Sequence, residues 1–220
     1  MKRFIYILSI LFLCFHGKAA DLDRYLASQG LVDVAAIDTT FHVELKYATS
    51  DNIMGEAVYE GITGVWLHPD AAEKLLKAQR LLKEKLPHYS LIIYDAARPM
   101  SVQQKMWNLV RGTDKTNYVS NPANGGGLHN YGMAVDLSIV DKSGQAISMG
   151  CDFDYFGVEA HINQEEELVK SGKITREELN NRLLLRSIMR EAGFTTVLYE
   201  WWHFNACSRA YAREHYPVIR

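Results

Sequence analysis

The sequence has few cysteines, no long run of proline, glycine or serine, and no excess of basic charge. With only three cysteines among 220 residues, a thiolate-rich structural metal site is not expected. No segment reads as a linker, a repeat or a low-complexity tract, so the length suits a single domain of roughly 200 residues. The 26 acidic residues outnumber 24 basic ones, without a basic stripe. That balance is not typical of a nucleic-acid-binding protein.

The first twenty residues differ from the rest of the chain. Lys2 and Arg3 form a basic start, residues 4–15 are uncharged and apolar, and small residues then precede the first acid. This layout predicts a signal peptide over residues 1–20, a mature domain over 21–220 and secretion, to the periplasm. The apolar stretch is too short for a stable membrane anchor, and the alternative interpretation is a buried N-terminal helix.

Removal of that segment leaves 21 basic against 26 acidic residues, a net charge of −5. Two cysteines, Cys151 and Cys207, then remain. In an oxidising compartment they can form a disulfide, and they can equally be separate buried apolar residues. The sequence leaves both possibilities open, and it specifies no oligomeric state.

Helices and short strands alternate along the mature chain. Apolar spacing and two flanking prolines predict a helix over residues 69–86. A capping box from Thr175 to Glu178 begins another helix, which ends near Gly193. Further expected elements are strands over 91–94, 134–140 and 195–199, a helix from Ser101 to about Gly112, and a loop over 113–128. The alternation indicates an α+β or mixed α/β domain.

A histidine and an aspartate flank a glycine that can reverse the chain. His129 ends a glycine-rich loop, and Asp136 lies seven positions later between Val135 and Leu137 of a predicted strand. An ionised carboxylate in such surroundings is costly to bury unless it is paired or binds a metal. Gly132 gives the backbone the freedom to bring both side chains to one point. Taken alone, such a pair is more often unrelated.

Two further groups of ionisable residues follow predicted strands. Glu200 and His203 enclose two tryptophans, which predicts a water-poor wall suited to ligand and base chemistry. The alternative is two core tryptophans with a rim glutamate and a hydrogen-bonded histidine. Strict alternation would put Glu200 and His203 on opposite faces, so the strand must end or bulge between them. Arg98 leaves the end of a buried strand, where functional loops are common.

In this order, the three stretches resemble the zinc-dependent D-alanyl-D-alanine dipeptidases, the family that includes the vancomycin-resistance dipeptidase. The similarity covers nearly all of the mature chain, and further matching segments are residues 45–52, 149–154 and 181–186. The resemblance implies a single α+β domain with a central, mainly antiparallel sheet flanked by helices. It also implies hydrolysis of D-alanyl-D-alanine to free D-alanine, so the expected partner is a small dipeptide.

The resemblance also implies a role for particular residues. His129, Asp136 and His203 are the implied ligands of one Zn²⁺ per chain, and such a set leaves a fourth position for water, as in catalytic zinc sites. Glu200 is the implied general base, which accepts the proton of the attacking water and then protonates the leaving amine. Arg98 is expected to stabilise the negative oxygen of the tetrahedral intermediate.

The two ends of the substrate are expected to meet different residues. Tyr47 and Asp154 match positions that hold the free ammonium, which would explain a preference for dipeptides. Gly127 stands where the family usually has a serine that helps to hold the C-terminal carboxylate. Gly127 can still offer a backbone N–H, so the departure from the family pattern leaves fine substrate preference open.

Two other functions compete with this interpretation. A related zinc D,D-carboxypeptidase or endopeptidase would act on peptidoglycan stem peptides, but such relatives generally lack the double tryptophan and have a more open groove. A non-enzymatic, metal-stabilised binding domain would need neither Glu200 nor Arg98. We therefore expect an enzyme without a nucleic-acid partner and, after signal cleavage, without a membrane anchor.

Overall fold

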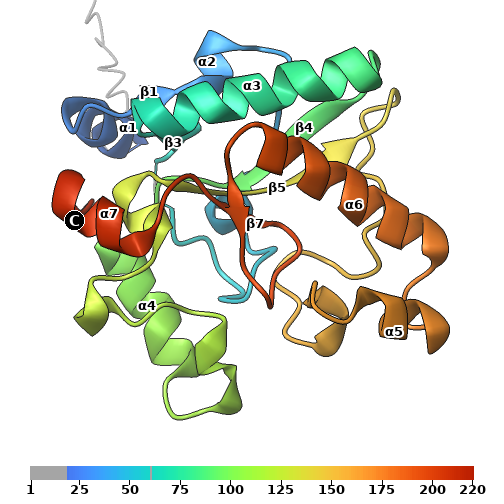
Figure 1. Ribbon diagram of the computed structural model, residues 1–220. Helices are drawn as coiled ribbons and strands as arrows, with labels where there is room; N and C mark the ends of the chain where they lie inside the picture. The colour runs from blue at the N-terminus through green and yellow to red at the C-terminus, as the bar shows by residue number, and fades with distance from the viewer. Residues whose placement is uncertain (1–18, 60) are drawn as a thin grey trace, which may run out of the picture.

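The computed structural model describes residues 19–59 and 61–220, and within them a five-stranded sheet lies at the centre (Figure 1). In spatial order its strands are β2 (His42–Val43), β4 (Ser90–Asp95), β5 (Ala134–Val140), β7 (His203–Asn205) and β6 (Thr195–Thr196). Only β2 and β4 pair in parallel; the other neighbours are antiparallel. The expected single α+β domain with a mainly antiparallel sheet is confirmed.

Helices surround the sheet in the view of Figure 1. They are α1 (Ala19–Ser28), α2 (Val34–Ile37), α3 (Pro69–Lys85), α4 (Met100–Val110), α5 (Glu165–Lys170), α6 (Arg176–Glu191) and α7 (Arg209–His215). In that view α3 and α6 lie above the sheet, α4 and α5 below it and α7 at the side. Short 3₁₀ turns are η1 (Lys46–Ala48), η2 (Asp114–Asn117), η3 (Pro122–Asn124), η4 (Leu128–Tyr131) and η5 (Val158–Ala160). A small antiparallel pair, β1 (Val32–Asp33) and β3 (Trp66–Leu67), lies beside α1.

The two longest helices form where the sequence predicts them. Helix α3 has proline in its first turn and a stripe of fully buried residues that packs on β4, including Leu75 and Leu82. At the start of α6, the Thr175 hydroxyl accepts the Glu178 N–H at 3.1 Å, and the Glu178 carboxylate accepts the Thr175 N–H at 2.7 Å. This reciprocal pairing satisfies two donors that a helix N-terminus leaves free.

The strand predictions are confirmed for β4 and β5 and wrong for most of residues 195–199. Every residue of β4 and β5 is buried, as expected for central strands that are covered on both faces. Strand β6 ends at Thr196, because the chain then leaves the sheet and the Leu198 carbonyl accepts the Ile162 N–H at 3.0 Å. The chain re-enters the sheet at His203. The strand interruption that the alternation of Glu200 and His203 required therefore lies before His203. Glu200 is in the loop that connects β6 to β7.

The segment 113–128 is a loop that contains the turns η2 and η3. The predicted signal peptide lies outside the described residues, except for Ala19 and Ala20 at the start of α1. Within the described part of the chain, no helix combines the length and apolarity needed to cross a bilayer. Cys151 and Cys207 are separate free thiols, so of the two possibilities that the sequence leaves open, the structure has the unpaired one.

Candidate active site

Three neighbouring strands bring ionisable side chains into one row. Asp136 of β5 lies directly opposite Asp95 of β4 on one side and opposite His203 of β7 on the other. The first of these pairings depends on a one-residue bulge at Tyr94, since Ile93 still faces Leu137. Residues directly opposite one another project to the same face, and the bulge re-aims Asp95 towards that face.

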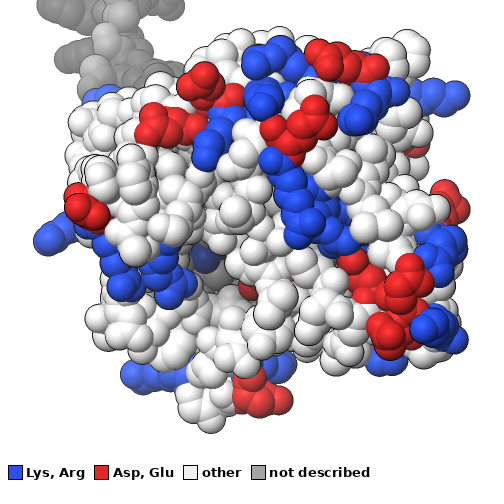
Figure 2. Space-filling model, in the orientation of Figure 1, with Lys and Arg blue, Asp and Glu red and all other residues white. Residues whose placement is uncertain are grey.

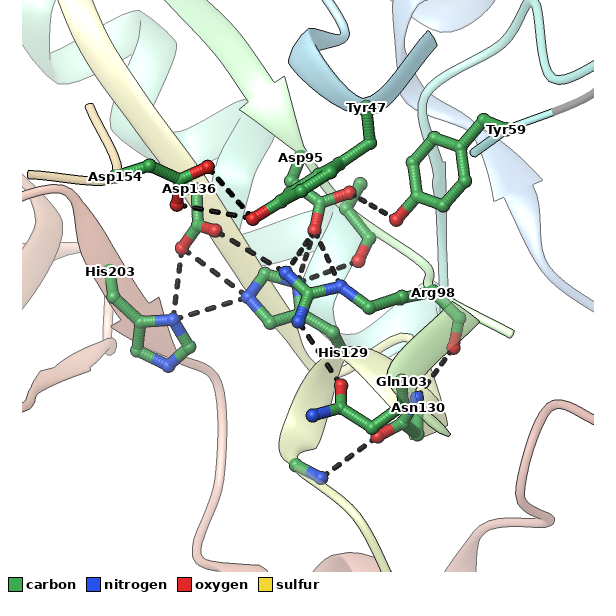
Figure 3. Close-up of polar contacts among 12 residues, drawn as sticks. Tyr47, Tyr59, Asp95, Arg98, Gln103, His129, Asn130, Asp136, Asp154 and His203 are labelled. Carbon is green, nitrogen blue, oxygen red and sulfur yellow. Dashed lines mark hydrogen bonds and ion pairs between the residues drawn. The ribbon is translucent and has the colours of Figure 1, made fainter. Parts of the chain in front are cut away.

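His129 completes a compact triangle of ligand atoms. The turn η4 places its ring beside the row, with Nε2 3.1 Å from His203 Nδ1 and 3.3 Å from Asp136 Oδ1 (Figure 3). The third edge, between His203 Nδ1 and Asp136 Oδ1, is 2.9 Å. Donors held at zinc distances of about 2.0–2.1 Å in a tetrahedron stand roughly 3.3–3.4 Å apart. The triangle is therefore close to the size of one tetrahedral face.

The ring nitrogens of His129 and His203 that point away from the triangle show why the triangle suits a cation. His129 Nδ1 donates to the Ala96 carbonyl at 2.7 Å, and His203 Nε2 donates to Asn205 Oδ1 at 2.8 Å. In a neutral imidazole the other nitrogen then carries a lone pair. Two lone pairs and a carboxylate oxygen thus converge without a proton between them. A metal ion satisfies all three, so this donor set fits one.

The surroundings also act on the Asp136 carboxyl. Burial alone would raise its pKa, but without a metal ion, protonation of the His129 and His203 rings places positive charge and N–H donors beside it and lowers the pKa of Asp136 well below its ordinary value of 3.8. Asp136 therefore stays ionised across the physiological range, as a metal ligand must.

Arg98 is held rigidly beside the triangle. Its Nε donates to Asp95 Oδ2 at 3.0 Å, its Nη2 donates to the same oxygen, and its Nη1 donates to Gln103 Oε1 at 3.1 Å. Tyr59 donates to the other Asp95 oxygen at 2.6 Å. The guanidinium lies 3.9 Å from the Asp136 carboxylate. Asp95 thus holds the Arg98 guanidinium close to any group that binds at the triangle.

Asp154 is the one described non-glycine residue with a positive φ, of 62°. Such a backbone is sparsely populated and is retained mainly where the surroundings or the function demand it. Its carboxylate accepts the Tyr47 hydroxyl at 2.9 Å and the Ile53 N–H at 3.4 Å. Burial raises the pKa of Asp154 to about 7, although the Tyr47 hydrogen bond opposes the rise. This turn therefore presents a carboxyl whose pKa lies near neutral pH.

Glu200 lies on the loop between β6 and β7. Its Oε2 is 3.7 Å from His203 Nδ1, and its side chain is only 16% exposed. Burial raises the pKa of Glu200 to about 8; His203 opposes the rise, and the negative charge of Asp136 adds to it. Glu200 is therefore next to the triangle without being part of it, and its affinity for a proton suits general-base chemistry.

All seven residues singled out in the sequence line one cavity of about 310 Å³. They are Tyr47, Arg98, His129, Asp136, Asp154, Glu200 and His203. An aromatic wall of Tyr118, Phe156 and Tyr199 borders the same cavity, with the rings of Tyr118 and Phe156 stacked 4.6 Å apart. Figure 2 shows the surface hollowed beneath α7, with basic side chains nearby and acidic atoms visible inside the hollow.

Comparison with known proteins shows which family this chain belongs to. A family model described as D-ala-D-ala dipeptidase matches residues 27–220. The chain belongs to that family. The D-alanyl-D-alanine dipeptidase of Escherichia coli (strain K12) is 35% identical over 189 residues, which is 86% of this chain and 89% of the relative. The D-alanyl-D-alanine dipeptidase of Enterococcus faecium is 31% identical over 180 residues, 73% of this chain and 83% of the relative.

Membership of the D-Ala-D-Ala dipeptidase family confirms the resemblance and makes the chain a hydrolase. The departure at Gly127 has a structural counterpart. The Gly127 N–H is already engaged, because it donates to Asn130 Oδ1 at 2.8 Å. The space beside Gly127 is taken by Ser120: a side chain at 127 would place Cβ 3.0 Å from the Ser120 hydroxyl oxygen.

Sequence reasoning missed residues that hold the dipeptidase site in place. Asp95 carried a weak signal, as the one charged residue in the apolar run 91–95. Asn205 carried another, because it follows His203 by two positions and so shares its face of a strand. Gln103 and Ser120 carried none, because their roles depend on tertiary contacts: Gln103 of α4 bonds to Ser120 in the 113–128 loop, and Ser120 bonds to Arg209 of α7.

Proposed function

We propose that this chain is a zinc dipeptidase that hydrolyses D-alanyl-D-alanine to D-alanine. The observation that carries the proposal is that a cation-binding triangle and a buried carboxyl for an ammonium, Asp154, line one small cavity. A metal site alone would support many reactions. Its combination with an amine-binding carboxyl favours a substrate whose amino group is free.

His129, Asp136 and His203 are the proposed zinc ligands, one ion per chain. When bound, zinc polarises the scissile carbonyl and makes a water acidic enough to attack at neutral pH. Glu200 accepts the proton of that water and transfers it to the leaving amine. Its desolvated carboxyl, 3.7 Å from a ligand nitrogen, has a high proton affinity and therefore suits both transfers.

Arg98 stabilises the negative charge that develops on the carbonyl oxygen. Its guanidinium is oriented in advance by Asp95 and Gln103, so little reorganisation is needed during the reaction. Tyr47 and Asp154 hold the ammonium of the substrate. An acylated amine has no charge to pair with Asp154, so this pair favours dipeptides over stem peptides.

The decisive experiment measures release of D-alanine from D-alanyl-D-alanine by the purified protein. We expect activity that a chelator abolishes and added zinc restores, together with little cleavage of a pentapeptide stem. Faster cleavage of the pentapeptide would favour the carboxypeptidase alternative. Absence of D-alanine release by the zinc-loaded protein would leave only a binding function.

We further propose that residues 1–20 direct secretion; the N-terminal sequence of the exported protein tests this.

N-acetylation of D-alanyl-D-alanine is expected to lower kcat/KM by about 10–100-fold. The acetyl group removes the positive charge that Asp154 would pair with, and charge-assisted hydrogen bonds contribute a factor of about 10–100 to binding. Asp154→Asn should lower kcat/KM for the free dipeptide by a similar factor and leave the acetylated compound equally poor. Efficient turnover of the acetylated dipeptide by the wild type would argue against this role of Asp154.

The pH dependence of KM should report the same contact. Asp154, whose pKa burial raises to about 7, is neutral below that pH and charged above it, while a free α-amine loses its charge near pH 8. KM is therefore expected to fall as pH rises through 7 and to rise again above 8. The facing groups Tyr47, Arg98 and Asp136 are present in the Asp154→Asn variant too. That variant should lose only the fall of KM as pH rises through 7. If this fall is unchanged in the variant, Asp154 is not the group that binds the ammonium.

A further inference from the structure

A dipeptide is a zwitterion, and the cavity described so far supplies a partner for only one of its ends. Among the described residues that line it, two arginines carry fixed positive charge, Arg98 and Arg209. Arg98 is already paired with Asp95. Arg209 has no carboxylate within ion-pairing distance in the described part of the chain, and its Nη2 donates to the Ser120 hydroxyl at 2.9 Å. Its charge is thus uncompensated.

The Ser120 hydroxyl lies close to the space that a side chain at 127 would occupy. A Cβ on Gly127 would stand 3.0 Å from Ser120 Oγ and 3.3 Å from Ser120 Cβ. The backbone of Gly127, with φ −101° and ψ −179°, is one that any residue adopts. Ser120 itself, and not backbone conformation, therefore crowds a side chain here and would have to shift by a few tenths of an ångström to admit one.

Hydrogen bonds orient Ser120 from both sides. Its carbonyl accepts Gln103 Nε2 at 2.8 Å, and Gln103 Oε1 in turn accepts Arg98 Nη1. Its hydroxyl oxygen accepts from Arg209, which leaves the hydroxyl proton to be donated elsewhere. Within the described residues that proton has no acceptor. Ser120 and Arg209 thus present an O–H and a guanidinium side by side to the same cavity.

We propose that Ser120 and Arg209 bind the C-terminal carboxylate of the dipeptide substrate. This assignment rests on the proposed function. The carboxylate accepts hydrogen bonds from the Ser120 hydroxyl and from the free guanidinium N–H groups of Arg209. Asp154 holds the ammonium at the other end. Gln103 links this pair to Arg98, so the carboxylate contact and the residue at the reacting carbonyl share one hydrogen-bonded frame.

The test compares D-alanyl-D-alanine with its C-terminal amide as substrates. For the wild type we expect a KM about 10–100-fold higher for the amide, because the amide lacks the charge. Arg209→Gln should raise KM for the acid about 10-fold, change KM for the amide about twofold at most, and leave kcat nearly unchanged. Arg213→Gln is the matched control: Arg213 is on the same helix but donates to the Asn124 carbonyl, away from this cavity. It should keep the wild-type ratio.

A reciprocal exchange tests the position of the hydroxyl. Ser120→Gly should reduce the preference for the acid, and adding Gly127→Ser to it should restore part of that preference, because the new side chain enters the vacated space. A merely structural role for Ser120 would affect acid and amide alike. An acid-to-amide ratio that stays unchanged in both Arg209→Gln and Ser120→Gly overturns the proposal.

Calorimetric binding of D-alanyl-D-alanine and its amide to the Glu200→Gln protein separates this proposal from the proposed function. If the acid binds better than the amide through Arg209 and the wild type shows no turnover, the carboxylate site stands and the dipeptidase assignment fails. If turnover is present but Arg209→Gln has no effect on either measurement, the dipeptidase assignment stands and the carboxylate site fails.

Discussion

Replacing His129, Asp136 or His203 with alanine is expected to remove most of the bound zinc and to lower kcat/KM by about 10³-fold or more. Each residue supplies one corner of a triangle with edges of 2.9 to 3.3 Å. Loss of one corner leaves two donors, which are too few to hold an ion tightly at neutral pH. Elemental analysis and steady-state kinetics on the three variants measure both effects.

The same experiment needs a measure of folding, because these side chains are largely buried. Asp136→Asn keeps the shape of the side chain but removes its charge, and it should also lose zinc. Zinc should raise the Tm of the wild type by mass action, and this zinc-dependent rise should disappear in each ligand variant. His88→Ala changes an exposed histidine between α3 and β4 and should retain metal, activity and the Tm rise. Full zinc content in all three alanine variants would contradict the ligand assignment.

Glu200→Gln is expected to keep its zinc and its fold while losing about 10²–10⁴ in kcat. The amide closely matches the carboxylate in shape but cannot take the proton of the attacking water. Because Glu200 Oε2 is 3.7 Å from His203 Nδ1 and outside the triangle, metal affinity should change little. KM should also change little, since a base acts mainly in the transition state.

Stability gives this variant a second readout. In the metal-free protein, burial raises the pKa of Glu200 from its ordinary 4.5 to about 8, so the folded state holds this proton more tightly than the unfolded state. The contribution of Glu200 to folding is then fully favourable below pH 4.5 and is lost as pH rises towards 8. The uncharged Gln avoids that loss, and the Tm of the metal-free variant at pH 8 should equal or exceed that of the wild type.

A matched control is Glu177→Gln on the exposed side of α6, which should leave kcat, zinc content and Tm unchanged. Near-normal turnover by Glu200→Gln would mean that another group accepts the proton, and the proposed mechanism would then be wrong. Zinc analysis and circular dichroism on the same samples exclude metal loss or unfolding as the cause of a low rate.

The sequence by itself determined the elements whose signals are local. Helix α3 follows from its prolines and apolar spacing, and α6 follows from the Thr175 capping box, because both patterns act within a few residues. Strand β5 follows from a short apolar run. The ordered motifs also determined the family and the identity of the seven cavity residues, since residue types in a specific order need no coordinates to be compared.

Only the tertiary structure decided how those residues meet. The bulge at Tyr94 sets Asp95 opposite Asp136, and the pairing of β5 with β7 sets Asp136 opposite His203. Both depend on strand register, which no single segment specifies. The early end of β6 depends on a bond to Ile162, more than thirty residues away. The position of Ser120 beside Gly127 likewise depends on how the 113–128 loop folds back on itself, because a hydroxyl can fill a neighbour's empty space only when the fold brings them together.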